Sequence, residues 1–129
     1  MIVLDTSAAF EFLADTNIGR RIAARLGRET EVHAPYLIDV ELVQVLRRQV
    51  RLNILSTARA ARLLEDFEAM RIVRYEHLFL VPRIWELRFN FTAYDACYLA
   101  LTEALGATLL TRDEALAPVK LRSGGVELM

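Results

Sequence analysis

Cysteine and lysine are almost absent from this sequence. Cys97 is the only cysteine, which excludes an internal disulfide framework and a zinc site built from cysteines. Free cysteine is usually buried, so Cys97 is expected to be a small core residue on a helix. Lys120 is the only lysine, and arginine therefore supplies nearly all of the positive charge. The net charge of −1 does not indicate a polyanion partner by itself, because the distribution of charge matters more than its sum.

Long apolar runs are absent as well. Uninterrupted apolar stretches span only a few residues, well below the roughly 20 needed to cross a bilayer. Asp5 and Glu11 interrupt the N-terminal apolar segment, so no secretory signal is visible. We therefore expect a soluble, cytoplasmic protein without a membrane partner. Its five glycines and three prolines fall at element boundaries, and no linker or repeat is found, so residues 1–129 are predicted to form a single domain.

Short apolar runs alternate with helical patterns along the chain. Strands are predicted at Ile2–Asp5, Glu31–Ala34, Ile72–Tyr75, Ala107–Leu110 and Val126–Leu128. Helices are predicted at Ser7–Leu13, Asn17–Leu26, Leu37–Val50, Ser56–Met70, His77–Arg88 and Thr92–Leu105, with a helical turn at Asp113–Ala117. This alternation is typical of a parallel sheet buried on both faces, and it predicts an α/β protein.

Some local details are also predicted. Pro35 is expected to open the third helix, whose apolar face would be Val43, Leu46 and Val50. Gly106 is expected to end the helix that starts at Thr92. In the helix predicted at His77–Arg88, the residues expected to share a face are Val81, Ile84, Trp85 and Arg88.

Two of the predicted strands run directly into an acid: "IVLD" ends at Asp5 and "ATLLTRD" ends at Asp113. In open parallel sheets, ligands bind outside the carboxyl ends of the strands. Capping of the next helix by Asp5 or Ser7 explains the first acid equally well on local grounds. Capping does not predict that a second strand also ends in an acid. The presence of both Asp5 and Asp113 therefore indicates a functional site at the carboxyl edge of the sheet.

Two further acids begin helices. Asp95 follows Thr92 at the spacing of a capping box, which makes a purely structural role a real alternative. Glu41 lies between Val40 and Leu42 about one turn into its helix. An ionised carboxylate is costly to bury without a partner or a metal, so a structural role explains Glu41 less well.

Asp5, Glu41, Asp95 and Asp113 together suggest one carboxylate cluster, built from two strand ends and two helix starts. Crowded carboxylates raise each other's pKa values and need a counter-charge, which a divalent cation supplies. An all-oxygen site favours Mg²⁺ or Mn²⁺ over Zn²⁺, so His33 and His77 are not expected to be ligands. The hydroxyl residues beside the acids could orient a carboxylate or a metal-bound water, or simply cap a helix; they are Thr6, Ser7 and Thr111.

Arginines gather in two segments, and the second follows Glu41 on the same predicted helix. We expect this second group to contact phosphates, which arginine binds in bidentate fashion; it consists of Arg47, Arg48 and Arg51. The alternative is an ordinary solvated helix face.

The sequence resembles the PIN domains, and specifically the VapC-type toxins of bacterial and archaeal type II toxin–antitoxin pairs. The resemblance rests on "MIVLDTSAAF", "PYLIDVELVQVLRR" and "TAYDACYLALTEALGATLLTRDEALA", and it covers nearly the whole chain. It implies a three-layer α/β/α fold with a central, mainly parallel sheet of four to five strands. It also places Asp5, Glu41, Asp95 and Asp113 at the family's acidic metal-site positions, and Ser7 at its supporting hydroxyl position.

The implied activity is Mg²⁺- or Mn²⁺-dependent endoribonuclease cleavage of cellular RNA such as tRNA, rRNA or mRNA. Implied partners are a second copy of the chain in a homodimer and a cognate VapB-type antitoxin, with which the chain would form a higher assembly. Gln44 lies where the family often carries a smaller polar residue such as Asn. This difference puts a supporting contact to a metal ligand in doubt, but not the metal ligand itself.

Mechanistically, Asp5 and Asp95 are expected to be the main metal ligands, with Glu41 and Asp113 closing the site directly or through waters. A metal-activated water would then attack the phosphodiester in line. Aspartyl phosphatases of the haloacid dehalogenase type are disfavoured, because Ser7 stands where they carry a second Asp. The remaining alternative is a catalytically silent PIN-like module that binds RNA or protein, although such a module would be expected to lose some of its acids.

Overall fold

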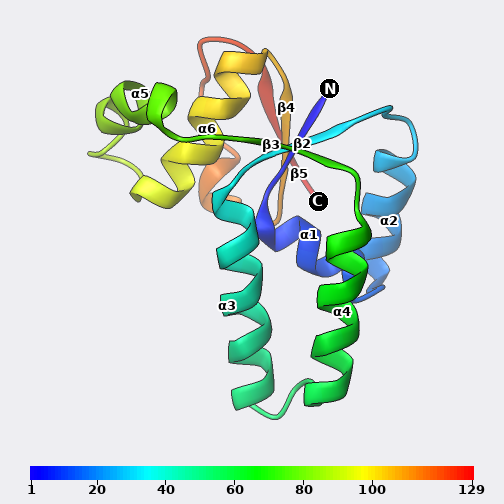
Figure 1. Ribbon diagram of the computed structural model, residues 1–129. Coiled ribbons are helices and arrows are strands. Elements are labelled where there is room, and N and C mark those ends of the chain that lie inside the picture. Colours follow the sequence, from blue (N-terminus) through cyan, green and yellow to red (C-terminus); the bar gives the residue numbers. More distant parts are fainter.

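The strands form one five-stranded sheet in the computed structural model, which describes residues 1–129 (Figure 1). All neighbouring strands are parallel, and their order in the sheet is β3-β2-β1-β4-β5. Their bounds are β1 (Ile2–Leu4), β2 (Val32–Pro35), β3 (Ile72–Tyr75), β4 (Thr108–Thr111) and β5 (Gly125–Leu128). The predicted α/β class and parallel sheet are confirmed.

The strand order places a topological switch point between β1 and β4. The chain runs outward from β1 through β2 to β3, and then returns to the other side of β1 as β4. Crevices at such points, outside the carboxyl ends of the strands, are where open α/β sheets bind ligands. Asp5 directly follows β1, and Asp113 lies two residues beyond β4, so both acids are at this edge.

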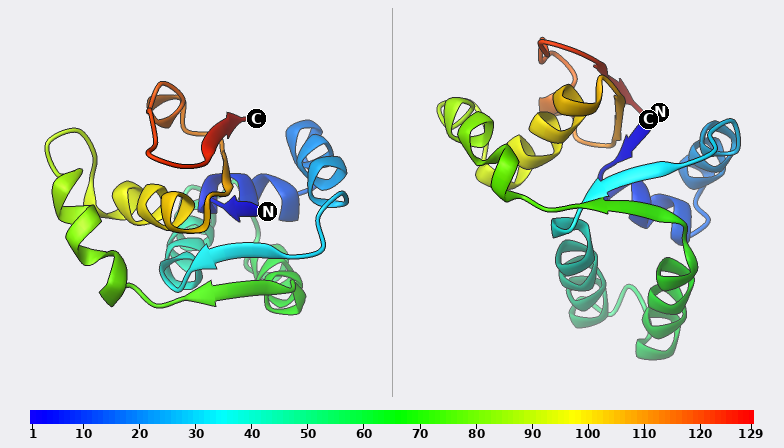
Figure 2. Two further views of the ribbon diagram at one scale, coloured as in Figure 1. Left: turned by 90° about the horizontal axis from the view of Figure 1, so that it is seen from above. Right: turned by 45° about the horizontal axis from the view of Figure 1, so that its top comes forward.

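The helices lie in two layers, one on each side of the sheet (Figures 1 and 2). One layer contains α1 (Thr6–Leu13), α2 (Asn17–Leu26), α3 (Leu37–Arg51) and α4 (Thr57–Ala69). The other contains α5 (Val81–Glu86) and α6 (Ala93–Leu105); two short 3₁₀ helices, η1 (Leu78–Leu80) and η2 (Glu114–Leu116), complete the fold. No helix has the length and apolar character to cross a membrane.

Several helix ends follow their sequence signals. The Thr92 and Ser56 side chains accept hydrogen bonds from the backbone N–H groups of Asp95 and Arg59, as N-cap residues do. Gly106 ends α6 with φ +59°, a left-handed conformation that glycine adopts without a steric penalty. The Thr92 cap fixes the start of α6, and therefore the position of Asp95 in its first turn.

Two predicted boundaries are wrong. Pro35 does not open α3; it is the last residue of β2, opposite Tyr75 of β3, and α3 begins at Leu37. The helix predicted at His77–Arg88 is shorter, because only Val81–Glu86 is α-helical. Pro82 lies in the first turn of this helix, where its fixed φ and missing N–H are tolerated, so the α-helix starts there and not at His77.

The buried face of α3 also differs from the prediction. Ile38, Leu42 and Leu46 face the core, whereas Val43 is 48% exposed. Val43, Leu46 and Val50 line a groove between α3 and α4. These two helices project from the body of the molecule as a pair (Figure 1). The predicted apolar face is therefore right for Leu46, which is buried, and for Val50, which packs partly buried against the core, and wrong for Val43.

Cys97 is buried on α6, as predicted. Burial raises the pKa of its thiol to about 11, so the thiol stays protonated at neutral pH. Cys97 therefore behaves as a small apolar core residue.

Candidate functional site

Asp5 lies at the carboxyl end of β1 and is only 9% exposed. Its Oδ2 accepts hydrogen bonds from the hydroxyls of Ser7, at 2.8 Å, and Thr111. Its Oδ1 accepts only a long bond of 3.4 Å from the backbone N–H of Ser7, so Asp5 is the N-cap of α1 but a weak one. Burial raises the pKa of Asp5, and the hydrogen bonds from Thr111 and Ser7 oppose that effect. A nearby cation would favour the ionised form.

Glu41 is held by two hydroxyl groups from other elements. Its Oε2 accepts from Thr6 on α1 and from Tyr98 on α6, both at 2.7 Å. The two hydroxyls also lie 2.8 Å apart, so they form a closed triangle with the carboxylate oxygen. Burial and the charge of Glu41 raise the pKa of Tyr98 well above its usual range, which keeps the phenol protonated and able to donate.

Asp113 is joined to Asp5 through the end of β4. The Thr111 hydroxyl donates to Asp5 and accepts from the backbone N–H of Asp113 at 3.0 Å. The Ser7 hydroxyl likewise donates to Asp5 while it accepts from the backbone N–H of Arg112 at 3.0 Å. The Asp113 side chain caps η2 through the N–H of Ala115. The carboxyl ends of β1 and β4 are thus fastened by hydroxyl side chains.

Asp95 lies in the first turn of α6, one turn before Tyr98. Its Oδ2 accepts from the Thr92 hydroxyl at 2.8 Å, and the predicted capping-box contact from its backbone N–H to Thr92 is present at 3.1 Å. Because residues three apart share a helix face, Asp95 and Tyr98 lie on the same side of α6. Tyr98 in turn contacts Glu41, so Asp95 belongs to the same region of the molecule.

The four carboxylates share one pattern. Each is oriented through hydrogen bonds to one oxygen, while the other oxygen has no bond or, in Asp5, only the long one to Ser7. No three of their side chains lie close enough together to hold a metal ion as they are placed in this structure. The donor set is nevertheless all-oxygen, anionic and partly free, which is the chemistry that Mg²⁺ and Mn²⁺ prefer. The residues therefore fit such an ion chemically.

Neighbouring acids and both histidines have other partners. Asp39 accepts two hydrogen bonds from Arg74, at 2.8 and 3.0 Å, and Glu114 is exposed on η2. The His33 ring is hydrogen-bonded to Tyr75, and His77 accepts from the backbone N–H of Leu37 at 3.1 Å. None of these four residues contacts the carboxylates described above.

Tyr98 is the functional residue that sequence reasoning missed. It is buried, and it makes the contact that joins α6 to Glu41 across 57 positions of sequence. The available signal was its position one turn after Asp95 on an otherwise apolar helix, where a buried hydroxyl needs a partner.

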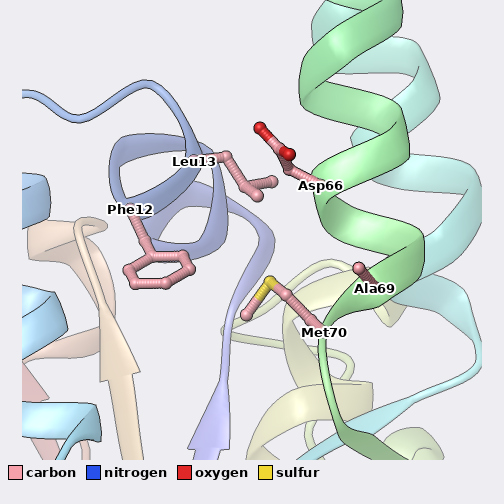
Figure 3. A pocket seen from close by; sticks show the side chains of 5 residues that line it. All are labelled: Phe12, Leu13, Asp66, Ala69 and Met70. Atoms are coloured by element: carbon pink, nitrogen blue, oxygen red, sulfur yellow. The ribbon is translucent and has the colours of Figure 1, made fainter.

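The principal cavities of the molecule are lined by residues other than these acids. One of about 340 Å³ lies between α1 and α4, where Leu13 and Met70 point into the space between the helices (Figure 3). Asp66 is its only polar lining residue. The acids instead lie near the carboxyl edge of the sheet, outside these cavities.

Three exposed arginines line a separate cavity of about 250 Å³ on α3, and none of them forms an ion pair: Arg47, Arg48 and Arg51. Arg25, Arg74 and Arg83, by contrast, are neutralised by carboxylates. The predicted basic group is therefore free to meet an external anion.

Comparison with known proteins identifies the fold. The family model described as "PIN domain" matches residues 2–120. The chain belongs to the PIN domain family. This PIN domain is 39% identical over 113 residues to VapC ribonuclease Mb0985 of Mycobacterium bovis, covering 88% of this chain and 86% of the relative. It is 36% identical to ribonuclease VapC12 of Mycobacterium tuberculosis, covering 100% of this chain and 99% of that protein. The predicted resemblance to VapC proteins is confirmed.

Solved structures share the architecture of this PIN domain at lower sequence identity. PAE2754 from Pyrobaculum aerophilum matches with a TM-score of 0.74 at 21% identity, covering 97% of this chain and 87% of that one. The structure of VapBC2 from Rickettsia felis bound to a DNA fragment from their promoter matches with a TM-score of 0.73 at 14% identity, covering 100% and 99%. At these identities the likeness supports the fold alone.

Proposed function

We propose that this PIN domain is an endoribonuclease toxin of a type II toxin–antitoxin pair that hydrolyses RNA phosphodiester bonds with Mg²⁺ or Mn²⁺. The observation that carries the proposal is the set of carboxylates at the switch point, each anchored through one oxygen with the other free to bind. The similarity to proteins named VapC ribonucleases supports RNA as the substrate.

In this proposal Asp5 and Asp95 are the main metal ligands, and Glu41 and Asp113 complete the site. A bound Mg²⁺ or Mn²⁺ ion would activate water and neutralise charge on the departing oxygen. Ser7 and Thr111 hold one oxygen of Asp5, so the free oxygen points in a fixed direction. Thr6 and Tyr98 do the same for Glu41 by donating to its Oε2. Such supporting hydrogen bonds commonly change metal affinity or activity by about 10- to 100-fold.

Phosphate binding is assigned to the unpaired arginines of α3, which are Arg47, Arg48 and Arg51. They follow Glu41 on the same helix, so RNA bound along α3 would lead toward the acids. Guanidinium groups suit this task because they bind phosphate oxygens in pairs.

A VapB-type antitoxin and a second copy of the chain are the proposed protein partners. An apolar groove of about 380 Å³ between α3 and α4 supports an interface with one of them; Val43, Leu46, Val50, Ala60 and Leu64 are among its lining residues. The Rickettsia felis structure with the same fold is described as VapBC2 bound to promoter DNA.

The test is cleavage of total cellular RNA by the purified protein in Mg²⁺, in Mn²⁺ and in EDTA. Discrete fragments are expected with either metal and not with EDTA. Asp95→Asn should abolish them, whereas Glu114→Gln, which removes an exposed carboxylate next to Asp113, should not. Metal-independent cleavage, or full activity of the Asp95 variant, would contradict the metal-site proposal. Intact RNA in every lane, from a folded protein that binds metal, would favour a non-cutting RNA- or protein-binding module.

A further inference from the structure

Large aromatic side chains are exposed at the end of α5, where ordinary packing would bury them. Trp85 is 66% exposed and Phe89 is 81% exposed. Trp85 belongs to the last turn of α5, and Phe89 lies in the connection between α5 and α6. Exposure of this much aromatic surface in one segment points to a ligand or a partner.

A guanidinium group lies against both of these rings. The Cζ atom of Arg88 is 4.4 Å from the centre of the Trp85 ring and 4.2 Å from that of Phe89. Arg88 also donates to the backbone carbonyl of Trp85 at 2.8 Å, and it forms no ion pair. The three side chains form an exposed aromatic cluster around an unpaired positive charge, here called the Trp85–Arg88–Phe89 platform.

The platform adjoins the start of α6. A cavity of about 250 Å³ extends from Trp85 and Arg88 to Phe91 and Ala93. Ala93 is the first residue of α6, and Asp95 is two residues further along, about 3 Å of rise on the helix axis. Tyr94, between them, is 62% exposed. The platform therefore lies close to the first turn of α6, which carries Asp95.

The chemistry of the platform favours an unpaired nucleobase as its occupant. Single-stranded RNA is bound by aromatic rings and arginine planes on which bases stack, with a positive charge nearby for the phosphates. The unpaired guanidinium of Arg88 supplies this positive charge next to the rings, whereas the neighbouring Arg83 is neutralised by Glu103 and Glu86.

We propose that the Trp85–Arg88–Phe89 platform is a base-stacking subsite that binds an unpaired nucleotide of the RNA next to the scissile bond. This inference rests on the proposed RNA substrate, and it deepens that proposal by naming a single-stranded segment as the feature recognised. Recognition by stacking tolerates different bases, so the platform would select for unpaired structure more than for sequence.

Trp85 is the only tryptophan of the chain, so its fluorescence reports on the platform alone. The experiment titrates the full-length protein in EDTA with a single-stranded oligoadenylate that resists cleavage through 2′-O-methyl groups. Quenching of Trp85 is expected, and the same strand paired with its complement should quench far less, because its bases are already stacked. Arg88→Lys, which keeps the charge but removes the planar group, should weaken binding roughly tenfold.

Controls separate stacking from general charge and from folding. Arg21→Ala removes one unpaired positive charge from α2, in the helix layer opposite α5, and should leave the quenching unchanged. With a dye-labelled strand, Trp85→Phe should bind nearly normally and Trp85→Ala roughly tenfold more weakly. In cleavage assays Trp85→Ala should raise KM and leave kcat close to normal.

Binding of the single strand without any change in Trp85 fluorescence would overturn the inference. The inference would also be overturned if Trp85 fluorescence fell with rising protein concentration in the absence of RNA and did not change when RNA was added. That result would assign the platform to a contact between two copies of the chain. Failure of metal-dependent cleavage would overturn the proposed function, and the fluorescence titration in EDTA would still decide the subsite.

Discussion

Asp5 shows how one side chain can be costly for the fold and useful for a site. Its buried carboxyl has a raised pKa, because burial penalises the charged form more than the hydroxyl bonds stabilise it. An Asp with a raised folded-state pKa stabilises the fold fully below its unfolded pKa of about 3.8, and this stabilisation is lost as the pH rises through the folded-state value. As the pH rises above the unfolded pKa, Asp5 therefore stabilises the fold less, and a bound cation would offset this loss by favouring the ionised form.

Asp5→Asn should separate the two roles. In the metal-free protein, the free energy of unfolding of the variant relative to wild type is expected to increase from pH 4 to pH 7, because only the wild type must ionise a buried group. RNA cleavage should fall by more than about 100-fold, since a lost ligand costs at least as much as a lost supporting contact. Urea unfolding at several pH values in EDTA, alongside cleavage in Mg²⁺, measures both. The account would be contradicted if the free energy of unfolding of the variant minus that of wild type were smaller at pH 7 than at pH 4.

For single residues, the sequence predicted that Asp5 and Asp113 lie at the same edge of the sheet, but it did not predict the hydrogen bonds that orient the acids. Asp5 and Asp113 could be placed because each follows an apolar run, and the carboxyl ends of parallel strands share an edge. The bond from Tyr98 to Glu41 could not be predicted, because it depends on how α6 packs across the sheet toward α3. Thr6, Ser7 and Thr111 were noted beside the acids, but only the folded chain shows that Thr6 orients Glu41 while the other two orient Asp5.

Among the elements, α5 and α6 are held together by a largely buried ion pair. Arg83 on α5 donates to both carboxylate oxygens of Glu103 on α6, at 2.7 and 2.9 Å, and the Glu103 side chain is only 7% exposed. The Arg83 guanidinium holds the pKa of Glu103 below its usual range. This pair fixes the distance between the platform segment and the helix that carries Asp95.

Glu103→Gln should loosen that attachment in a pH-dependent way. A carboxyl with a lowered folded-state pKa stabilises the fold above its unfolded pKa of about 4.5, and the contribution is lost as the pH falls through the lower folded-state value. The variant should therefore lose about 1–3 kcal/mol of unfolding free energy at pH 7 and progressively less below pH 4.5. Chemical denaturation across this range measures the difference. A loss of the same size at pH 3 and pH 7 would show that the charge of Glu103 is not what binds α5.

Element prediction succeeded where local signals are strong, as at Ser56, Thr92 and Gly106. It failed for the length of α5, which is α-helical only over Val81–Glu86. The residues expected to share a face do line one cavity, and they are Val81, Ile84, Trp85 and Arg88. Trp85 on this face is nevertheless exposed, because α5 is short and only part of it packs against α6. Apolar residues on a helix have the same spacing in sequence whether their face packs in the core or stays exposed. The spacing alone therefore could not predict that Trp85 is exposed.

Across the whole molecule the net charge is only −1, but groups of positive and negative side chains lie on different surfaces. Carboxylates gather at the carboxyl edge of the sheet, while unpaired arginines lie along α3 and at the end of α5. The strand order determines which acids share the carboxyl edge of the sheet. This strand order could not be predicted from the sequence, because many strand orders are compatible with the same alternation of strands and helices. RNA affinity should therefore depend on where the charges lie and not on their total.

Replacing Arg47, Arg48 and Arg51 together by Gln tests this division. Each phosphate contact to a single strand adds about 0.7 to the slope of log affinity against log salt concentration, so the slope should fall by about 2. Replacing Arg20, Arg21 and Arg28 by Gln removes the same charge from α2 and the residues after it, and should leave the slope nearly unchanged. Binding of labelled single-stranded RNA in EDTA, at several salt concentrations, gives both slopes. Equal reductions in the two variants would mean that net charge, and not the α3 arginines, governs RNA binding.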